Sequence, residues 1–274
     1  MEGSHQLRAD GTSLAVLRLH EALALWEHEK KSLRCQWLYV CARRGGKSLN
    51  TVWIEPGENP IERIKGVFGA DLQNATSFEL EFLHSPRRRY LRSSSKEQWN
   101  HMRGRNAMFI ELGGKVGRWA ALQMLAANLT FRAILTRHLA TLRLKQTLPT
   151  VIPVTLFQTR QLFCDNQRAA DRQCAPVEMF RGNRVVPIAA VSQDNVRQTA
   201  RAMARWLAAQ VNEAGACCYK YWPSRDQFDT NNNAIRQWMA TVCLNRAARA
   251  FRSGRLAAIA RRNLAYNLES TFRR

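Results

Sequence analysis

Acidic residues are scarce in this chain of 274 residues. Only 21 Asp and Glu face 42 Lys and Arg, which gives a formal net charge of +21 and a pI near 10.8. A protein so far from neutrality repels copies of itself, so we expect a negatively charged partner such as nucleic acid, an anionic membrane face or an acidic polymer. A bias towards arginine codons would explain why arginine outnumbers lysine, but not why acidic residues are few.

Long uninterrupted hydrophobic runs are also missing. The apolar stretches 14–25 and 119–134 are broken by polar residues and fall short of the ~18 apolar residues that indicate a transmembrane helix. The first eleven residues are polar and resemble neither a secretory signal nor a mitochondrial presequence. Because 46% of residues are hydrophobic, we expect a soluble, cytoplasmic protein with a real core and no transmembrane segment.

Motifs for metals and for common hydrolases are absent. The seven cysteines form no Cys-x-x-Cys pair, the six histidines have no His-x-x-x-His spacing, and no Gly-x-Ser-x-Gly elbow occurs. Gly46-Lys47-Ser48 resembles the end of a phosphate-binding loop, but Cys41 stands where that loop needs glycine. The sequence therefore predicts no metal and no cofactor, and it leaves open whether the protein is an enzyme.

Hydrophobic periodicity divides the chain into a mixed part and a helical part. It predicts an α+β fold, with an N-terminal mixed α/β domain over 1–147 and a mainly α-helical, helical-hairpin domain over 151–274. The boundary falls at the proline-containing segment 148–153, and 164–187 is expected to be a loop. The elements predicted for the first domain are a helix over 13–31, a β-hairpin over 35–55, a helix starting at Pro60 with Asn59 as its cap, strands over 77–84 and 107–112 separated by a basic loop, and a helix over 122–144. Those predicted for the second are a helix from Ser192 to Gly215 and a pair over 231–251 and 256–272.

The segment 219–238 combines aromatic rings with amides and carboxylates, which is what binding a sugar or a base requires. A loop that caps the following helix explains the same residues equally well. If the segment binds a ligand, we expect one cleft in which substrate is held by a set of rings, an amide and a guanidinium: Tyr219, Tyr221, Trp222, Asn232 and Arg236.

Two carboxylates in this segment are the candidates for catalysis. Asp229 paired with Arg236 would stay ionised, whereas an unpaired, buried Asp226 would have a raised pKa and could act as an acid. Asn232 and Arg236 are four residues apart and are expected to share a helical face. Asp229 or Thr230 is the expected cap of that helix.

Residues of this segment and of the following helices resemble a known group of domains. Tyr-x-Tyr at 219–221, the following acidic loop, Ile235-Arg236 and the hairpin with Asn263 and Asn267 resemble the opening helical hairpins of bacterial α/α-toroid domains, which occur in carbohydrate-active and related enzymes. Those domains often have His-Ala-Gly after the arginine, where this chain has Gln-Trp-Met. The resemblance implies a truncated toroid and a possible protein partner that completes the helical domain. More faintly, the hairpin-helix-strand order of 1–147 is similar to the AMME-candidate protein family, whose Leu-Arg-Gly-Cys-type motif is absent.

Two regions of the sequence are rich in arginine. Residues expected to bind a polyanion are clustered in 87–105 and 246–274, namely Arg87, Arg88, Arg89, Arg246, Arg249 and Arg252. The last three recur every three residues and should share a helical face, although a solvated face with counterions is an alternative. The leading hypothesis is recognition of an acidic or sugar-containing polymer, with its processing left open. The alternatives are a nucleic-acid-binding protein and a partner-dependent subunit of a larger complex.

Overall fold

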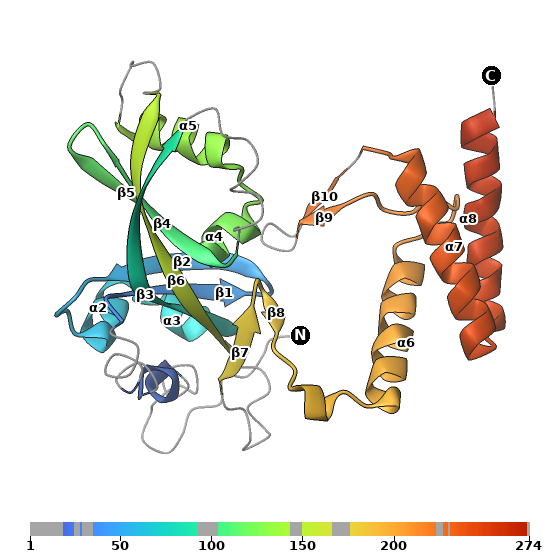
Figure 1. The fold of residues 1–274 in the computed structure, drawn as a ribbon. Coiled ribbons are helices and arrows are strands. Elements are labelled where there is room, and N and C mark those ends of the chain that lie inside the picture. Colours follow the sequence, from blue (N-terminus) through green and yellow to red (C-terminus); the bar gives the residue numbers. More distant parts are fainter. Residues whose placement is uncertain are drawn as a thin grey trace. The chain divides into compact units, whose positions relative to one another are not determined.

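The chain forms two compact units, residues Met1–Val185 and Val186–Arg274. The first is built on an antiparallel sheet with helices and the second is mainly helical, which confirms the predicted α+β class (Figure 1). The computed structural model describes residues 19–24, 28, 35–92, 104–142, 150–165, 176–222, 227–229 and 231–272.

Within the described residues, the sheet of the first unit has eight strands, in the order β2-β1-β3-β6-β4-β5, with β7 pairing with β6 and β8 pairing with β7. Every described pairing is antiparallel. The strands are β1 (Trp37–Arg44), β2 (Lys47–Ile54), β3 (Ser77–Arg92), β4 (Asn106–Leu112), β5 (Lys115–Trp119), β6 (Val151–Asp165), β7 (Val177–Phe180) and β8 (Asn183–Arg184).

The predicted hairpin over 35–55 is confirmed as β1 and β2. Its turn is formed by Gly45 and Gly46, with φ of 56° and 85°. These left-handed angles suit glycine and match the twist of the two strands. The Gly-Lys-Ser sequence is therefore part of a hairpin and not a loop between a strand and a helix.

Strand β3 is longer than predicted. It continues through the segment that was expected to be a basic loop, because Arg87–Arg92 pair with residues 151–156 of β6. A bulge between His84 and Arg87, with Ser85 at φ 50°, re-aims the strand without ending it. The prediction of a loop after residue 84 is thus wrong for residues 85–92, and residues 93–103 lie outside the described part of the chain.

The division between the units lies later than the expected boundary at 148–153. Residues 151–153 of that segment belong to β6, which pairs with β3 on one side and with β4 and β7 on the other. A strand held on both sides belongs to the sheet, so the first unit extends to Val185. Part of the predicted loop 164–187 is in fact the β7–β8 hairpin.

Helices of the first unit include α2 (Pro60–Phe68), α3 (Asp71–Asn74), α4 (Ala121–Ala126) and α5 (Phe131–Leu142). The predicted start of α2 is confirmed, since the Asn59 side chain accepts hydrogen bonds from the backbone N–H groups of Ile61 and Glu62. The predicted single helix over 122–144 is broken into α4 and α5, with Asn128 at φ 48° between them. Residues 19–24 are helical, and the rest of the predicted helix 13–31 is largely undescribed.

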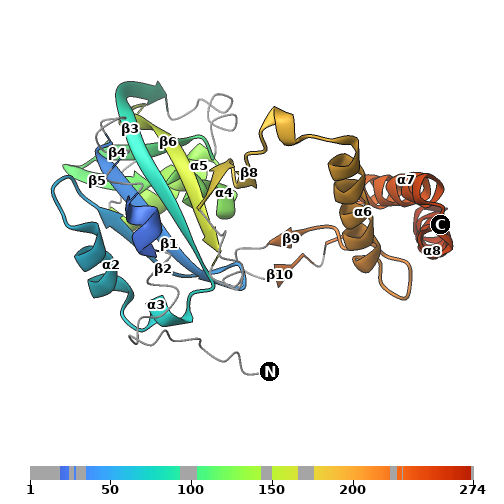
Figure 2. The same cartoon turned by 90° about the horizontal axis from the view of Figure 1, so that it is seen from below.

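The sheet is strongly curled, so its two ends meet across the inner face. The Trp53 ring of β2 lies 5.6 Å from the Phe109 ring of β4, and Arg118 of β5 pairs with Glu55 at 2.8 Å. The helix at 19–24, α2 and α3 cover the outer face of β1–β3, and α4 and α5 pack against β4 and β6 (Figure 2). The interior of the curl is apolar at the Trp53–Phe109 end.

The second unit is a small helical assembly. It consists of a 3-10 turn (Ile188–Ala190), α6 (Gln193–Ala209), the short strands β9 (Tyr221–Trp222) and β10 (Gln227–Phe228), and the helices α7 (Ala234–Phe251) and α8 (Gly254–Phe272). Ser192 caps α6 as predicted, by accepting from the Asn195 N–H. Small buried residues such as Ala208, Ala248 and Ala260 line the contacts among the three helices.

Candidate functional site

The segment 219–238 contains a short aromatic hairpin. Strands β9 and β10 pair, and the Tyr221 and Phe228 rings lie 4.8 Å apart between centroids. The Lys220 Nζ lies 3.6 Å from the centroid of the Trp222 ring, a cation–π contact. Tyr219, Tyr221 and Trp222 are half-buried and Phe228 is exposed. The hairpin therefore offers ring surface, as the sequence predicts.

The polar residues of the predicted cleft do not come together as expected. The Asp229 Oδ1 accepts hydrogen bonds from the backbone and side chain of Asn231 at 2.9 and 2.7 Å, and Asp229 forms no ion pair with Arg236. Arg236 is exposed in the first turn of α7, and Asn232 precedes that helix, so the two share no helical face. The cap of α7 is Asn233 and not Asp229. Asp226 lies outside the described residues.

Asn232 contacts the helical hairpin instead. Its Nδ2 donates to the Tyr266 hydroxyl at 3.0 Å, and its Oδ1 accepts from the Gln237 Nε2 at 2.9 Å. Asn232 thus links the segment before α7 to both α7 and α8. Among the predicted substrate-binding residues, it has the clearest structural role.

A buried polar network, which was not predicted, lies between α7, α8 and the loop before β9. Gln237 accepts from the Cys217 N–H at 2.9 Å and donates to the Cys217 carbonyl at 2.6 Å. Asn263 Nδ2 donates to the Gly215 carbonyl at 2.7 Å and to Gln237 Oε1 at 3.2 Å. Thr241 donates to Asn263 Oδ1 and accepts from Asn267 at 2.8 Å.

All four side chains of this network on the helices are almost fully buried. The signal for them was present in the sequence, because Gln237 and Thr241, like Asn263 and Asn267, are four residues apart on faces that are otherwise apolar. Buried polar groups that satisfy one another hold a unique arrangement, and in this network only the Asn267 Oδ1 has no hydrogen-bond partner among the described residues. The network therefore holds the loop 215–217 on the helical hairpin.

The C-terminal arginines lie on the surface of the second unit. Arg246 and Arg249 are exposed on α7, whereas Arg252 ends that helix in a left-handed conformation with φ 50°. The prediction that all three share a helical face is wrong for Arg252, because this residue is the C-cap of α7. None of the three forms an ion pair with a described residue, and Arg255, Arg261 and Arg262 on α8 are exposed as well.

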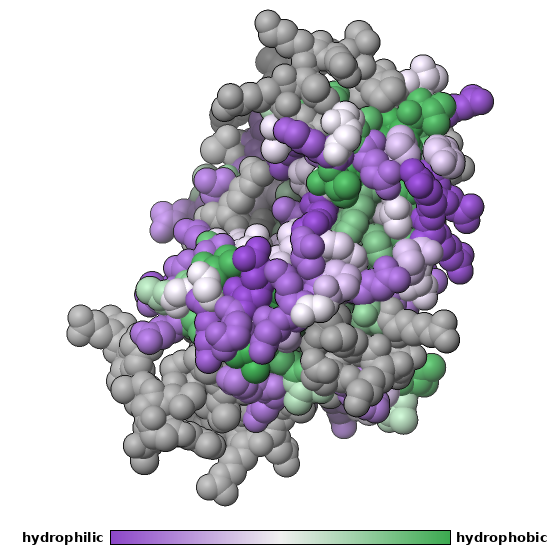
Figure 3. Space-filling model, turned by 90° about the vertical axis from the view of Figure 1, so that its left-hand side faces the viewer, coloured by the Kyte–Doolittle hydropathy of each residue, from purple (hydrophilic) through white to green (hydrophobic). Residues whose placement is uncertain are grey.

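The arginines of the first unit are arranged differently. Arg87, Arg88 and Arg89 are exposed on β3, where alternation places Arg88 on the opposite face from its neighbours. Arg88 pairs with Glu111 at 2.9 Å and lies over the Tyr90 ring. In the face drawn in Figure 3, hydrophilic side chains cover wide areas between smaller hydrophobic ones. The arginines at 87–89 therefore point to two faces of the strand and are partly neutralised, unlike the arginines of the second unit.

The curled sheet also encloses polar groups. Glu81 lies between Tyr39 and Gln161 in adjacent strands and is fully buried. Its two carboxyl oxygens accept hydrogen bonds from the N–H groups of Ala121 and Leu122 at the start of α4, at 2.7 and 2.8 Å. Burial raises the pKa of Glu81 to about 7, although these two hydrogen bonds oppose the shift. Burial also raises the pKa of Tyr39.

Cys41 and Arg43 lie further along the same face of β1. Arg43 pairs with Glu79 at 2.7 Å and donates to the Gly46 carbonyl at 3.0 Å. The Cys41 sulfur lies 3.4 Å from the Ser48 hydroxyl, and burial raises the pKa of its thiol. A thiol held in its neutral form is a poor nucleophile, so this face favours a structural role.

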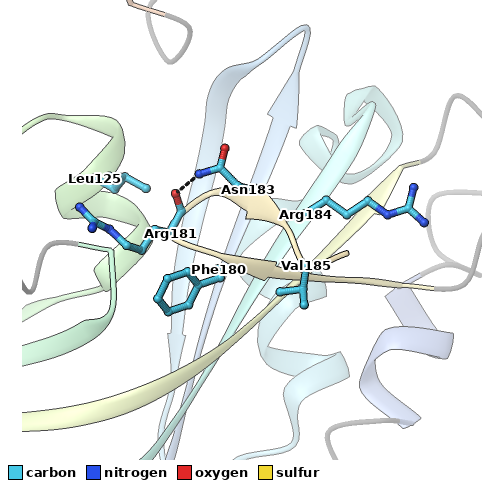
Figure 4. A pocket seen from close by; sticks show the side chains of 6 residues that line it. All are labelled: Leu125, Phe180, Arg181, Asn183, Arg184 and Val185. Carbon is cyan, nitrogen blue, oxygen red and sulfur yellow. Dashed lines mark hydrogen bonds between the residues drawn. The ribbon is translucent and has the colours of Figure 1, made fainter. Parts of the chain in front are cut away.

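A pocket of ≈ 690 Å³ lies in the first unit, between α4 and the β7–β8 hairpin. Figure 4 shows Phe180 and Arg181 extending towards the side of Leu125, while Arg184 extends the other way. The lining is formed by three apolar and three polar side chains: Leu125, Phe180, Val185, Arg181, Asn183 and Arg184.

Comparisons with known proteins assign no family. No family model matches the chain, and no curated protein matches it. One solved structure, described as an uncharacterized protein PH0010 from Pyrococcus horikoshii, shares 11% identity at a TM-score of 0.34, covering 57% of this chain and 93% of that chain. Likeness at this level indicates neither family nor function.

The described residues were also searched for metal sites and for membrane-spanning helices. They contain no group of three or more His, Cys, Asp or Glu that could hold a metal ion. None of the helices described is both long and apolar enough to cross a membrane.

Proposed function

We propose that this protein recognises an acidic polymer through the arginines of its second unit. The observation that carries the proposal is that Arg246, Arg249 and Arg252 are exposed and form no ion pair with a described residue. Processing of the polymer is not part of the proposal, because Asp229 is bonded to Asn231 and does not pair with Arg236.

The charge balance of this unit supports the proposal. Residues 186–274 contain thirteen arginines and one lysine against five acidic residues. Unpaired like charges on one helix destabilise it, which makes a purely structural purpose a poor explanation. Guanidinium groups form paired hydrogen bonds with phosphate or carboxylate, so these exposed arginines fit a polymer that carries such groups. The half-exposed rings of β9–β10 could add contacts to sugar rings.

Charge reversal on α7 tests this function. The double variant Arg246→Glu/Arg249→Glu should bind heparin and duplex DNA at least about tenfold more weakly, and its log–log salt dependence should be shallower by about two. Both follow because each lost contact releases about one counterion fewer. Fluorescence anisotropy between ~50 and ~200 mM salt would measure the effect.

The matched control reverses two exposed arginines of the first unit that form no ion pair with a described residue, Arg44→Glu/Arg137→Glu. This variant has the same net charge, so a general charge effect would weaken binding equally in both variants and contradict the proposal. A wild-type protein that binds neither polymer at ~50 mM salt would also contradict it. Nucleic-acid binding, the alternative, requires a clear preference for DNA over heparin and a loss on reversing Arg87 and Arg89.

A second candidate function, a partner-dependent subunit, is favoured by the outer face of α7. Ile235, Met239 and Val242 are 70%, 53% and 47% exposed and lie opposite the side that packs on α8. Arg246 and Arg249 continue this face towards the C-terminus. The partner that fits is a helix whose apolar stripe is continued by acidic residues. Such a partner helix would take the place of the further helical hairpins that the sequence resemblance to α/α-toroid domains implies.

A synthetic helical peptide tests this second candidate. A peptide with a leucine stripe continued by glutamates should bind the full chain, and Met239→Glu should weaken binding about tenfold or more, because it puts a charge into the apolar contact. A peptide with lysines in place of the glutamates should not bind. Equal weakening by Met203→Glu, an exposed methionine on α6, or equal binding of both peptides in a titration, would contradict this candidate.

A further inference from the structure

We propose that the pocket between α4 and the β7–β8 hairpin binds a small aromatic phosphate. This site lies in the first unit and is independent of the polymer-binding arginines of the second. Its volume of ≈ 690 Å³ falls in the range of roughly 300–1,000 Å³ that small-molecule sites occupy. The ligand class follows from the rigidity of the walls, the exposed ring and the unpaired arginines.

The hairpin wall of the pocket is preformed. Its turn consists of Arg181 and Gly182, with φ of 52° and 75°, and the Asn183 Nδ2 donates to the Arg181 carbonyl at 3.2 Å. A Cβ on Gly182 would lie 3.0 Å from the Leu125 side chain, and one on Gly104 would lie 3.1 Å from the same side chain. Both glycines therefore allow close packing on α4, so the hairpin is held against the helix before any ligand binds.

Phe180 supplies a stacking surface. It is a large apolar residue on β7 and is 53% exposed at the pocket. The Arg105 guanidinium carbon lies 5.6 Å from the centroid of its ring. An aromatic ring with a cation beside it attracts a second planar ring that carries negative charge. This exposed ring therefore gives a planar ligand a surface to stack on.

The charge around the pocket is positive and uncompensated. Arg105, Arg181 and Arg184 form no ion pair with any residue that the structure describes. The only acid within the hairpin sequence 177–184 is Glu178, which pairs with Arg160 at 3.4 Å. Because the Arg181 side chain extends on the same side of the hairpin as the Phe180 ring (Figure 4), one ligand can stack on the ring while its phosphate meets the guanidinium. A phosphate suits the planar fork of arginine through paired hydrogen bonds.

Calorimetric titration of the full chain tests this assignment with four probes. Adenosine 5′-monophosphate and phenyl phosphate carry both a ring and a phosphate, whereas adenosine and inorganic phosphate carry only one each. We expect at least one of the first two to bind about tenfold or more tightly than the last two. Binding of adenosine 5′-monophosphate alone would identify a nucleotide as the source, and binding of both would identify the aromatic phosphate group itself. Absence of binding by both, or inorganic phosphate or adenosine binding as tightly, would overturn the proposal.

Two substitutions connect binding to this pocket. Phe180→Ala should weaken the better probe about five- to a hundredfold, by removing the stacking surface. Arg181→Asn should weaken it about tenfold, since asparagine tolerates the left-handed turn but cannot grip the phosphate. Arg137→Ala, an exposed arginine on α5, is the control and should change nothing. Unchanged affinity in the first two variants would overturn the assignment even if the wild type binds. The variant Arg246→Glu/Arg249→Glu should still bind the better probe, so a failure of this pocket proposal can be told apart from a failure of polymer recognition.

Discussion

The free energy of unfolding of the first unit will fall by up to about 3 kcal/mol as the pH rises from about 4.5 to about 7, because of one carboxyl group. Burial raises the pKa of Glu81 from its ordinary value of 4.5 to about 7. The unfolded chain therefore loses this proton near pH 4.5, while the folded unit keeps it until about pH 7. A group that binds its proton more tightly in the folded state stabilises that state at low pH, and this contribution is lost as the pH rises through the folded pKa.

Glu81→Gln should abolish this pH dependence. An amide does not ionise, so between pH 4.5 and 7 the variant lacks the part of the slope that Glu81 causes. The variant also has one oxygen in place of two to accept from the N–H groups of Ala121 and Leu122, which costs about 1–3 kcal/mol at acid pH. Hydrogen exchange of the β3 amides across this pH range measures the effect. Glu62→Gln, at an exposed position in α2, is the control, and a Glu81→Gln variant with the wild-type slope would contradict the account.

Local signals predicted the elements that local contacts determine. Asn59 and Ser192 cap their helices as expected, because a side chain that accepts from an N–H two or three residues later needs no tertiary contact. The glycine turn between β1 and β2 is determined in the same way. The continuation of β3 through Arg87–Arg92 depends on β6, far away in the sequence, so no local pattern showed it. The placement of the division between the units had the same cause.

The candidate site shows the same limit. Aromatic content alone predicted ring surface at Tyr221, and the structure adds the neighbouring Phe228 ring. The proposed pair of Asp229 and Arg236 assumed that a loop folds back, and a closer partner, Asn231, accounts for the Asp229 carboxylate. The pocket at Phe180 was not predicted because it requires the packing of Gly104 and Gly182 on α4. Spacing within one element can be seen in a sequence, whereas contacts between elements cannot.

Asn263→Leu should destabilise the second unit by about 3 kcal/mol. Leucine has a similar size, so the change removes hydrogen bonds without opening a large cavity. Asn263 is fully buried, and its loss leaves the Gly215 carbonyl without its partner at 2.7 Å and the Thr241 hydroxyl with only its longer bond, at 3.4 Å, to the Gln237 carbonyl. The backbone offers no easy rearrangement, because a Cβ on Gly215 would lie 2.5 Å from the Arg262 carbonyl oxygen. Each polar group that is buried without a partner costs about 1–3 kcal/mol.

Hydrogen exchange of the full chain measures this loss where it arises. Amides of α8 and of the loop 212–217 should exchange roughly a hundredfold faster in Asn263→Leu, while those of β1 and β3 in the first unit should not change, since the network lies within the second unit. Asn245→Leu is the matched control, because Asn245 is exposed on α7 and surface substitutions usually change stability by less than about 0.5 kcal/mol. Equal protection in the two variants would show that the network contributes little and that the small buried residues Ala208, Ala248 and Ala260 alone hold the three helices together.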